Sequence, residues 1–527
     1  MKKIFSIVLS GILIFSATSC KKYLDINTNP NLPTKATPAL VLPAALAGTA
    51  ALIVNTGDYN SYGSQSNGYF GNAGGFGSLG VLISYAYTTG DFNGLFQNTY
   101  DNLEDYQYII DNSEAGSTFN AAANIMKAYD YQMLVDTYND VPYSEALKGV
   151  DKLQPKYDKA EDIYKDLGDK LDAAIVAMKA ATSDITFQRA DPLFGGDVTK
   201  WAQFANTLKL RLIIRAGGKV TFTKPTPDAA TGFLTENAIF QPKYTKTAGK
   251  QNPYWDRWAF SETGGARGAG AVFMPSKWII SFFDGVKFSD DLRGELIFNQ
   301  YNGVSTPSNQ LGYTGADAPK SPTPNFWYTY DIWDQSGLGL FKGESAGQPI
   351  MLASESYFLQ AEANLKGILS NGTTAKQNYE AGVTEAFKYL YLAAGYNPEQ
   401  NIVSDAVLDA EGLPKLDVAV TDYLSLSSNP NANWDGPGDK LEKIITQKYL
   451  ALIYQFGAET WNEYRRTGFP AITGNAPTAT FASTVSQSTG ANKLPTRILY
   501  PVSEYSYNQA NTPSGISPYT NKIFWAK

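Results

Sequence analysis

Apolar residues recur at helical spacing along several separate stretches of this 527-residue chain. One stripe comprises Ile163, Leu167, Leu171, Ala174, Ile175 and Met178, and a second comprises Trp201, Phe204, Ala205, Leu208 and Leu212. Similar stripes run through 379–390 and 441–456. Because a helix with one apolar face must bury that face against a neighbour, the pattern predicts a mainly α-helical fold.

The predicted helices come in pairs. We place helical hairpins at about 102–139, 161–216, 350–394 and 441–467. Paired amphipathic helices bury their apolar faces by stacking on the next pair, which is the principle of helical-repeat scaffolds. The spacing of the pairs is irregular, so periodicity alone does not identify a repeat family.

A different kind of sequence separates the second hairpin from the third. Residues 217–348 are rich in Gly, Pro, Asn, Thr and aromatic residues and show little helical spacing. Loops held on a rigid scaffold commonly carry the binding residues of a protein. We therefore predict a single domain over residues 51–527. In it, helical regions at about 102–216 and 350–467 flank a variable, loop-rich insert at about 217–348.

The N-terminus has the pattern of a secretory signal that ends at a cysteine. A basic start precedes the apolar run Ile4–Phe15, and small residues lead to Cys20. Cys20 is the only cysteine of the chain, so it has no disulfide partner, and we predict that it carries lipid. Residues 1–19 are then removed, and 20–50 form a lipidated tether. No later apolar stretch is expected to supply the ~20 residues of a membrane-spanning helix.

Composition excludes several classes of function. The formal net charge is −7 and basic runs are absent, which argues against nucleic acid as a partner. The chain contains no histidine, which removes the base of Ser-His-Asp and Cys-His catalysis and the usual nitrogen ligand of zinc. The enzymatic option that remains is a carboxylate pair, as in glycoside hydrolysis.

Several segments along the chain together carry a family resemblance. They are Asp25–Asn31 (DINTNPN), Asp140–Leu147 (DVPYSEAL), Gly196–Arg215 (GDVTKWAQFANTLKLRLIIR), Glu355–Asn364 (ESYFLQAEAN), Ile445–Leu452 (ITQKYLAL) and Glu459–Pro470 (ETWNEYRRTGFP). On these segments the chain resembles the SusD/RagB family of outer-membrane lipoproteins from Bacteroidetes.

The resemblance implies a scaffold of tetratricopeptide-like helix pairs that carries a variable ligand-binding surface. It also implies an outer-membrane location at the cell surface and a partner, a SusC-like TonB-dependent transporter. Proteins of this kind capture nutrient molecules, usually oligosaccharides and sometimes peptides, and are not enzymes. Two alternatives remain open: a peptide ligand, and a lipid-anchored glycosidase that uses two carboxylates.

Aromatic residues gather in the insert. The predicted ligand contacts there are Trp255, Trp258, Trp327 and Trp333, together with Tyr328, Asp256 and Arg257. A flat ring packs against the apolar face of a sugar or against a peptide, and flanking polar groups bind hydroxyl or backbone groups. A second aromatic segment, from Tyr59 to Phe96, adds Tyr69 and Tyr85 to the prediction.

The segment 431–442 has a spacing typical of a calcium-binding loop. Asn431, Asn433, Asp435 and Glu442 match the oxygen ligands at positions 1, 3, 5 and 12 of an EF-hand. The first position holds Asn rather than Asp, and no amphipathic helix leads into the loop. We therefore expect an ordinary turn and no bound cofactor, with calcium as the alternative.

The segment 459–470 is expected to belong to the frame of the fold. Trp461 lies within a helical pattern, so its ring is predicted to pack in the core. Arg465 and Arg466 are predicted to pair with carboxylates or to cap a helix end.

Overall fold

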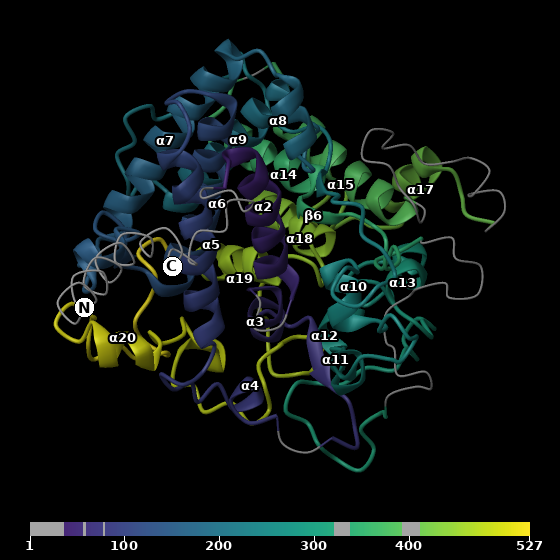
Figure 1. Ribbon diagram of the computed structural model, residues 1–527. Coiled ribbons are helices and arrows are strands. Elements are labelled where there is room, and N and C mark those ends of the chain that lie inside the picture. The colour runs from purple at the N-terminus through teal and green to yellow at the C-terminus, as the bar shows by residue number, and fades with distance from the viewer. Residues whose placement is uncertain (1–35, 56–58, 77–78, 321–337, 371, 393–411) are drawn as a thin grey trace, which may run out of the picture.

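A computed structural model describes residues 36–55, 59–76, 79–320, 338–370, 372–392 and 412–527. The fold is mainly helical, as predicted (Figure 1). Strands form only short antiparallel pairs within these ranges: β1 (Phe70–Asn72) with β5 (Phe273–Pro275), β2 (Val141–Pro142) with β3 (Tyr157–Asp158), and β4 (Ala238–Phe240) with β6 (Gln348–Met351).

Long helices make up the scaffold. They are α2 (Pro38–Val54), α5 (Asn93–Asp111), α6 (Thr118–Tyr138), α7 (Ala160–Ala180), α9 (Val198–Ala216), α14 (Ala353–Leu365), α15 (Ala375–Tyr391), α18 (Lys440–Ala451) and α19 (Gly457–Thr467). Shorter elements are α3 (Tyr59–Ser66), α4 (Val81–Ser84), η1 (Gly149–Lys152), α8 (Ile185–Ala190), α10 (Pro253–Trp258), α11 (Gly268–Val272), α12 (Lys277–Ile280), α13 (Asp291–Ile297), α17 (Leu416–Tyr423), η2 (Ala491–Lys493) and α20 (Val502–Tyr507).

The helix pairs stack in chain order. The first three predicted hairpins are confirmed, because α5 packs on α6, α7 on α9, and α14 on α15. Neighbouring pairs join through α6 against α7 and through α9 against α14, and α18 then packs on α14 and α15 (Figure 1). Local sequence sets the helix ends. The Asp197 carboxylate accepts the backbone N–H groups of Thr199 and Lys200 at 2.9 and 3.1 Å at the start of α9.

The fourth predicted hairpin is wrong in its main contact. Helix α19 packs chiefly on α3, almost four hundred residues earlier in the sequence, and has only a minor contact with α18, which includes the ion pair of Lys448 with Glu463. The close approach depends on two glycines. A Cβ atom on Gly63 would lie 2.0 Å from the carbonyl carbon of Gly457, and one on Gly457 would lie 2.3 Å from the Ser64 hydroxyl. Helical spacing within one segment carries no signal of such a long-range contact.

The predicted boundary of the tether at residue 50 is also wrong. Residues 38–54 form α2, whose Leu42, Leu46 and Ile53 are buried against α5, α6 and α3. An 18-residue window within the stretch from Pro38 to Ser66 has a mean hydropathy of 1.8, which by length and composition alone is enough for a membrane-spanning segment. In this fold the apolar side chains of α2 contribute to the protein core, which explains their hydrophobicity without a membrane.

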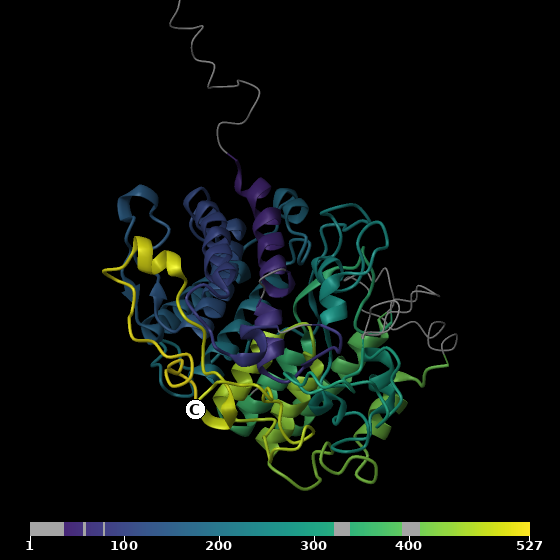
Figure 2. The ribbon, with the colours of Figure 1, turned by 90° about the horizontal axis from the view of Figure 1, so that it is seen from below.

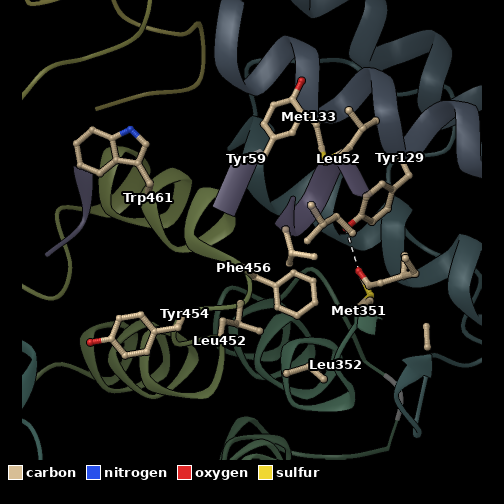
Figure 3. Close-up of a cluster of buried hydrophobic side chains, with 14 of the residues drawn as sticks. Leu52, Tyr59, Tyr129, Met133, Met351, Leu352, Leu452, Tyr454, Phe456 and Trp461 are labelled. Atoms are coloured by element: carbon tan, nitrogen blue, oxygen red, sulfur yellow. Dashed lines mark hydrogen bonds between the residues drawn. The ribbon is translucent and has the colours of Figure 1, made fainter. Parts of the chain in front are cut away.

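The centre of the core joins elements from both ends of the chain (Figure 3). Leu52 of α2, Tyr59 of α3, Met133 of α6 and Phe456, which precedes α19, belong to the same buried cluster. The Tyr129 hydroxyl donates a 2.9 Å hydrogen bond to the Ile350 carbonyl of β6. Burial of side chains of this size stabilises a fold by about 1.5–3 kcal/mol each, so the N- and C-terminal halves depend on one another.

A buried cluster of charges lies among the stacked helices. Arg215 of α9 contacts Asp136 of α6 at 2.5 Å, and Glu459 and Glu463 of α19 at 2.5 and 3.2 Å. The other pairs are Arg211 with Glu355 and Glu459, Lys448 with Glu355 and Glu463, and Arg466 with Glu362 and Glu463. All of these side chains are less than one-tenth exposed. We call this set the central charge cluster; it connects α6, α9, α14, α18 and α19.

Glu459 illustrates the electrostatic balance in the central charge cluster. Burial alone would raise the pKa of its carboxyl group, but the positive charges of Arg211 and Arg215 outweigh burial and lower that pKa to about 2. The carboxylate therefore stays ionised in the folded protein at any ordinary pH.

Replacement of one charge in this cluster is expected to be costly. Glu459→Gln leaves Arg215 and Arg211 short of a negative partner in the core, so the free energy of unfolding should fall by about 3–5 kcal/mol at pH 7. Guanidinium denaturation followed by far-UV circular dichroism measures this change.

The difference in free energy of unfolding between the parent protein and Glu459→Gln should also depend on pH. The folded pKa of Glu459, about 2, lies below its ordinary value of 4.5, so its stabilising contribution is present above pH 4.5 and is lost as the pH falls toward 2. The stability difference between parent and variant should therefore shrink by about 3 kcal/mol over that interval. A constant difference from pH 5 to pH 2 would contradict this assignment.

Candidate functional site

Segments far apart in the sequence meet at one end of the molecule. Residues 69–76, 301–320 and 479–488 lie together beside α4, α11 and α12, at the lower end of Figure 1. Backbone hydrogen bonds join them: the Gly74 N–H donates to the Pro319 carbonyl at 2.7 Å, and the Thr484 N–H donates to the Leu311 carbonyl at 2.9 Å. We call this surface the loop face.

Two buried asparagines hold the loop face in place. The Asn72 amide donates to the Tyr313 carbonyl at 2.8 Å and accepts the Gly312 N–H at 2.7 Å. The Asn309 amide donates to the Asn72 carbonyl at 2.7 Å. Both side chains replace backbone pairing where no regular sheet exists, so these loops have a defined shape.

Two aromatic side chains are exposed on this surface. Phe76 is 39% exposed and Tyr313 is 40% exposed. The Tyr313 hydroxyl donates a 2.6 Å hydrogen bond to Asp317, which raises the pKa of Tyr313 and lowers that of the Asp317 carboxyl. A ring with an accessible face beside a carboxylate can stack on a sugar and bind a hydroxyl group.

Four of the rings predicted as ligand contacts lie in the core instead. Trp255 and Trp258 are 4% and 2% exposed, and Tyr69 and Tyr85 are fully buried. Trp258 packs on Phe70 with ring centroids 5.2 Å apart, and Tyr69 packs on Tyr449 at 4.6 Å. In this structure the core encloses these four rings, so they do not present a face to a ligand.

The local helix explains the error at the two tryptophans. Residues 253–258 form α10, and its helical period places Trp255 and Trp258 on the inward face. Asp256 and Arg257 lie between the two tryptophans in the sequence and are partly exposed. Asp256 pairs with Arg267, and the Arg257 guanidinium lies 5.4 Å from the centre of the Trp258 ring. These two polar residues remain predicted ligand contacts.

Other predictions fall outside the described residues. Trp327, Tyr328 and Trp333 belong to 321–337, and Cys20 belongs to 1–35, neither of which the structure describes. Their roles therefore remain predictions from the sequence.

The calcium-like segment forms a turn that holds a lysine. The Lys443 ammonium donates hydrogen bonds to the carbonyls of Asn433, Gly436 and Pro430, the last two at 3.0 and 3.4 Å. Asp435 pairs with Lys376, and the Glu442 N–H is capped by Asp439. Calcium in this loop remains the alternative raised by the spacing. Within the described ranges no group of three or more His, Cys, Asp or Glu side chains could hold a metal ion.

The pattern of the whole sequence matches one protein family. The match to the SusD-like family, described as "starch-binding associating with outer membrane", covers residues 30–501. The chain belongs to the SusD-like family.

Solved structures of SusD-like proteins share this fold. A SusD homologue from Bacteroides uniformis has 23% sequence identity and a TM-score of 0.66, with 92% of this chain and 99% of that chain covered. A SusD-like protein from Bacteroides thetaiotaomicron has 22% identity and a TM-score of 0.66, with 92% and 98% covered. A chitin-binding SusD homologue from Flavobacterium johnsoniae has 21% identity and a TM-score of 0.64, with 92% and 98% covered. The chain matches none of the curated proteins.

The exposed rings of this SusD-like protein were missed at the level of sequence. Phe76 lies between Gly75 and Gly77, and Tyr313 follows Gly312, but Tyr69 also follows a glycine, Gly68, and is fully buried. A neighbouring glycine therefore does not distinguish an exposed ring from a core ring.

Stability measurements distinguish core rings from face rings. Trp258→Ala should lower the free energy of unfolding by about 3–5 kcal/mol, because it removes a buried indole from the aromatic core. Phe76→Ala and Tyr313→Ala should each cost less than about 1 kcal/mol, because neither ring is enclosed. Chemical denaturation of the three variants checks this order, and equal losses would contradict the placement of the rings.

Proposed function

We propose that this SusD-like protein is a non-catalytic, lipid-anchored outer-membrane protein that captures nutrient oligosaccharides and passes them to a SusC-like TonB-dependent transporter. The observation that carries the proposal is the pair of exposed rings, Phe76 and Tyr313, on the ordered loop face of a family described as starch-binding. The chitin-binding function of the Flavobacterium johnsoniae homologue supports a glycan ligand for this chain as well.

The chemistry of the loop face suits reversible capture. Aromatic stacking contributes about 0.5–1.5 kcal/mol per ring beyond the burial of area, so a few contacts give modest affinity. Asp317 and the amide-rich loops supply acceptors and donors for hydroxyl groups. Weak binding of this kind allows a ligand to be released to a transporter. A peptide remains the alternative ligand, because rings and backbone groups also bind peptides.

The position of the chain start supports a surface anchor. The described chain begins near Ala36, whose carbonyl accepts a 2.8 Å hydrogen bond from Tyr108 at the end of α5. In Figure 2, which looks toward the loop face, the first turn of α2 (purple) lies at the edge of the molecule. A lipid on Cys20 would therefore attach the protein by its edge and leave the loop face free for a ligand and a transporter.

Titration with maltoheptaose and chitohexaose tests the ligand-binding role. If either glycan binds the parent protein, Phe76→Ala and Tyr313→Ala should each weaken that binding about two- to tenfold, the loss expected for one stacked ring. Tyr507→Ala is the matched control, because Tyr507 is an aromatic residue of α20 that is 76% exposed and lies outside the loop face.

Each other outcome has a clear meaning. Unchanged affinity in both ring variants would place the glycan elsewhere, and binding of peptides alone would favour the peptide alternative. Release of shorter sugars from either glycan, lost on replacement of one Asp or Glu, would overturn the non-catalytic assignment.

The anchor is tested in cells. Cys20→Ser should shift the protein from the outer-membrane fraction to the soluble fraction, because the acyl chains that supply about 0.8 kcal/mol per buried CH₂ are no longer attached. Cell fractionation with immunoblotting measures the shift, and Ser19→Ala serves as a neighbouring control. Retention of Cys20→Ser in the membrane would contradict lipid anchoring at this residue.

A further inference from the structure

A cavity lies where the end of the chain folds back on α19. It has a volume of about 610 Å³, and its lining residues come from three segments, 461–468, 489–496 and 519–527, of which only some residues face the cavity. The Lys527 N–H donates to the Arg465 carbonyl at 3.0 Å, and the Thr496 N–H donates to the Pro518 carbonyl at 2.7 Å, so the walls are tied together. This volume falls within the range of about 300–1,000 Å³ that is usual for small-molecule sites. We call it the C-terminal pocket.

One side of the C-terminal pocket is aromatic. The Tyr464 ring is only partly buried and stacks on the buried Trp461 ring, with centroids 5.6 Å apart and planes 9° apart. Phe481 meets Tyr464 edge-on at 4.9 Å, and the Asn492 amide donates to the Tyr464 hydroxyl at 2.9 Å. The tyrosine is therefore held as a flat surface with polar groups at its edge.

The charge of the lining is the second feature. The charged side chains of the lining are Arg465, Lys522 and Lys527, and none of its residues is Asp or Glu. This concentration of positive charge contrasts with the net charge of −7 of the whole chain. A positive pocket in an acidic protein favours an anionic ligand.

Arg465 carries this argument, because it is buried without a carboxylate. Its guanidinium donates to the Thr496 carbonyl at 2.9 Å, to the Asp136 carbonyl at 2.7 Å, and to the Asn462 amide oxygen. Its Nε has no hydrogen-bond partner in the described part of the chain, and the residue is 8% exposed. The Asp136 carboxylate is already bonded to Arg215, Tyr164 and Trp525.

Four other buried arginines in the described ranges do have such a partner: Arg211, Arg215, Arg293 and Arg466 each lie within 4 Å of at least one carboxylate oxygen. Arg497, also buried, resembles Arg465, because its guanidinium donates to the Tyr138 and Ile498 carbonyls and not to a carboxylate. Burial disfavours an isolated cation, and it lowers the pKa of Arg465, the nearby charge of Arg215 adding to that effect. The Trp461 and Trp525 rings, whose centres lie 5.6 and 5.0 Å from the guanidinium carbon, offset part of this cost, and an anion in the pocket would add the full negative charge that the rings do not carry.

We propose that the C-terminal pocket binds the carboxylate of an acidic sugar, with the sugar ring on Tyr464 and the carboxylate directed toward Arg465 and Lys522. The assignment to a sugar rests on the glycan-binding function proposed above, whereas the assignment to an anion rests on the charges of the pocket. Residues 484–492 connect this pocket with the loop face, so it is a second site on the same protein.

Calorimetric titration of the full mature chain with trigalacturonate tests the proposal. Trigalacturonate should bind at least about tenfold more tightly than its fully methyl-esterified form, because the ester has the same rings without the charge. Lys522→Ala should weaken trigalacturonate binding about three- to tenfold, and the exposed Lys224→Ala, which lies outside the pocket, should not change it.

Lys522 is chosen because Arg465→Ala also removes hydrogen bonds inside the core and can fail to fold. Absence of trigalacturonate binding, or equal binding of the ester, would overturn the proposal. Equal binding of triglutamate would overturn the assignment to a sugar. If maltoheptaose or chitohexaose binds and trigalacturonate does not, only this inference fails; if none of the three binds, the proposed function fails as well.

Discussion

The stacking of the helix pairs depends on the central charge cluster. Arg211 and Arg215 of α9 contact carboxylates from α6, α14 and α19, so one helix holds three others in position. Loss of one partner leaves an uncompensated charge in the core, which costs more than loss of an apolar contact of similar size. The geometry is also directional, because a guanidinium group binds carboxylates in its own plane. Apolar faces alone allow helices to slide past one another, whereas this cluster defines their register.

The scaffold also fixes the position of the loop face. Helix α19 takes part in the charge cluster and packs on α3 through Gly63 and Gly457. Helix α3 leads within a few residues into β1, whose Asn72 fixes the 309–313 loop. The candidate binding surface is therefore built from loops whose ends are held by a rigid core. This arrangement gives a binding site a defined shape without regular secondary structure around it.

Helical spacing predicted most of the scaffold, and it failed where contacts are distant in sequence. The stripes in 161–216 and 350–394 correspond to α7, α9, α14 and α15, because the apolar spacing within each helix indicates which of its faces is buried. The tryptophans of α10 were wrongly predicted as ligand contacts, because clustering of aromatic residues does not distinguish a buried aromatic core from an exposed platform. The pairing of α19 with α3 and the exposure of Phe76 and Tyr313 depend on three-dimensional neighbours. This chain has only 17–23% identity to solved structures that share its fold, so the fold is kept although most residues differ.

Two adjacent arginines of α19 have different roles, one in the scaffold and one at the C-terminal pocket. Arg466 pairs with Glu362 and Glu463 within the central charge cluster, as predicted for the segment 459–470. Arg465 was expected to do the same or to cap the helix, but it bonds only to carbonyl and amide oxygens and lines the C-terminal pocket. A turn of about 100° between neighbouring helical positions is sufficient to separate them. A helix whose inner face supports the scaffold thus presents a charge to a cavity on its other side, and a frame motif can also contribute to ligand binding.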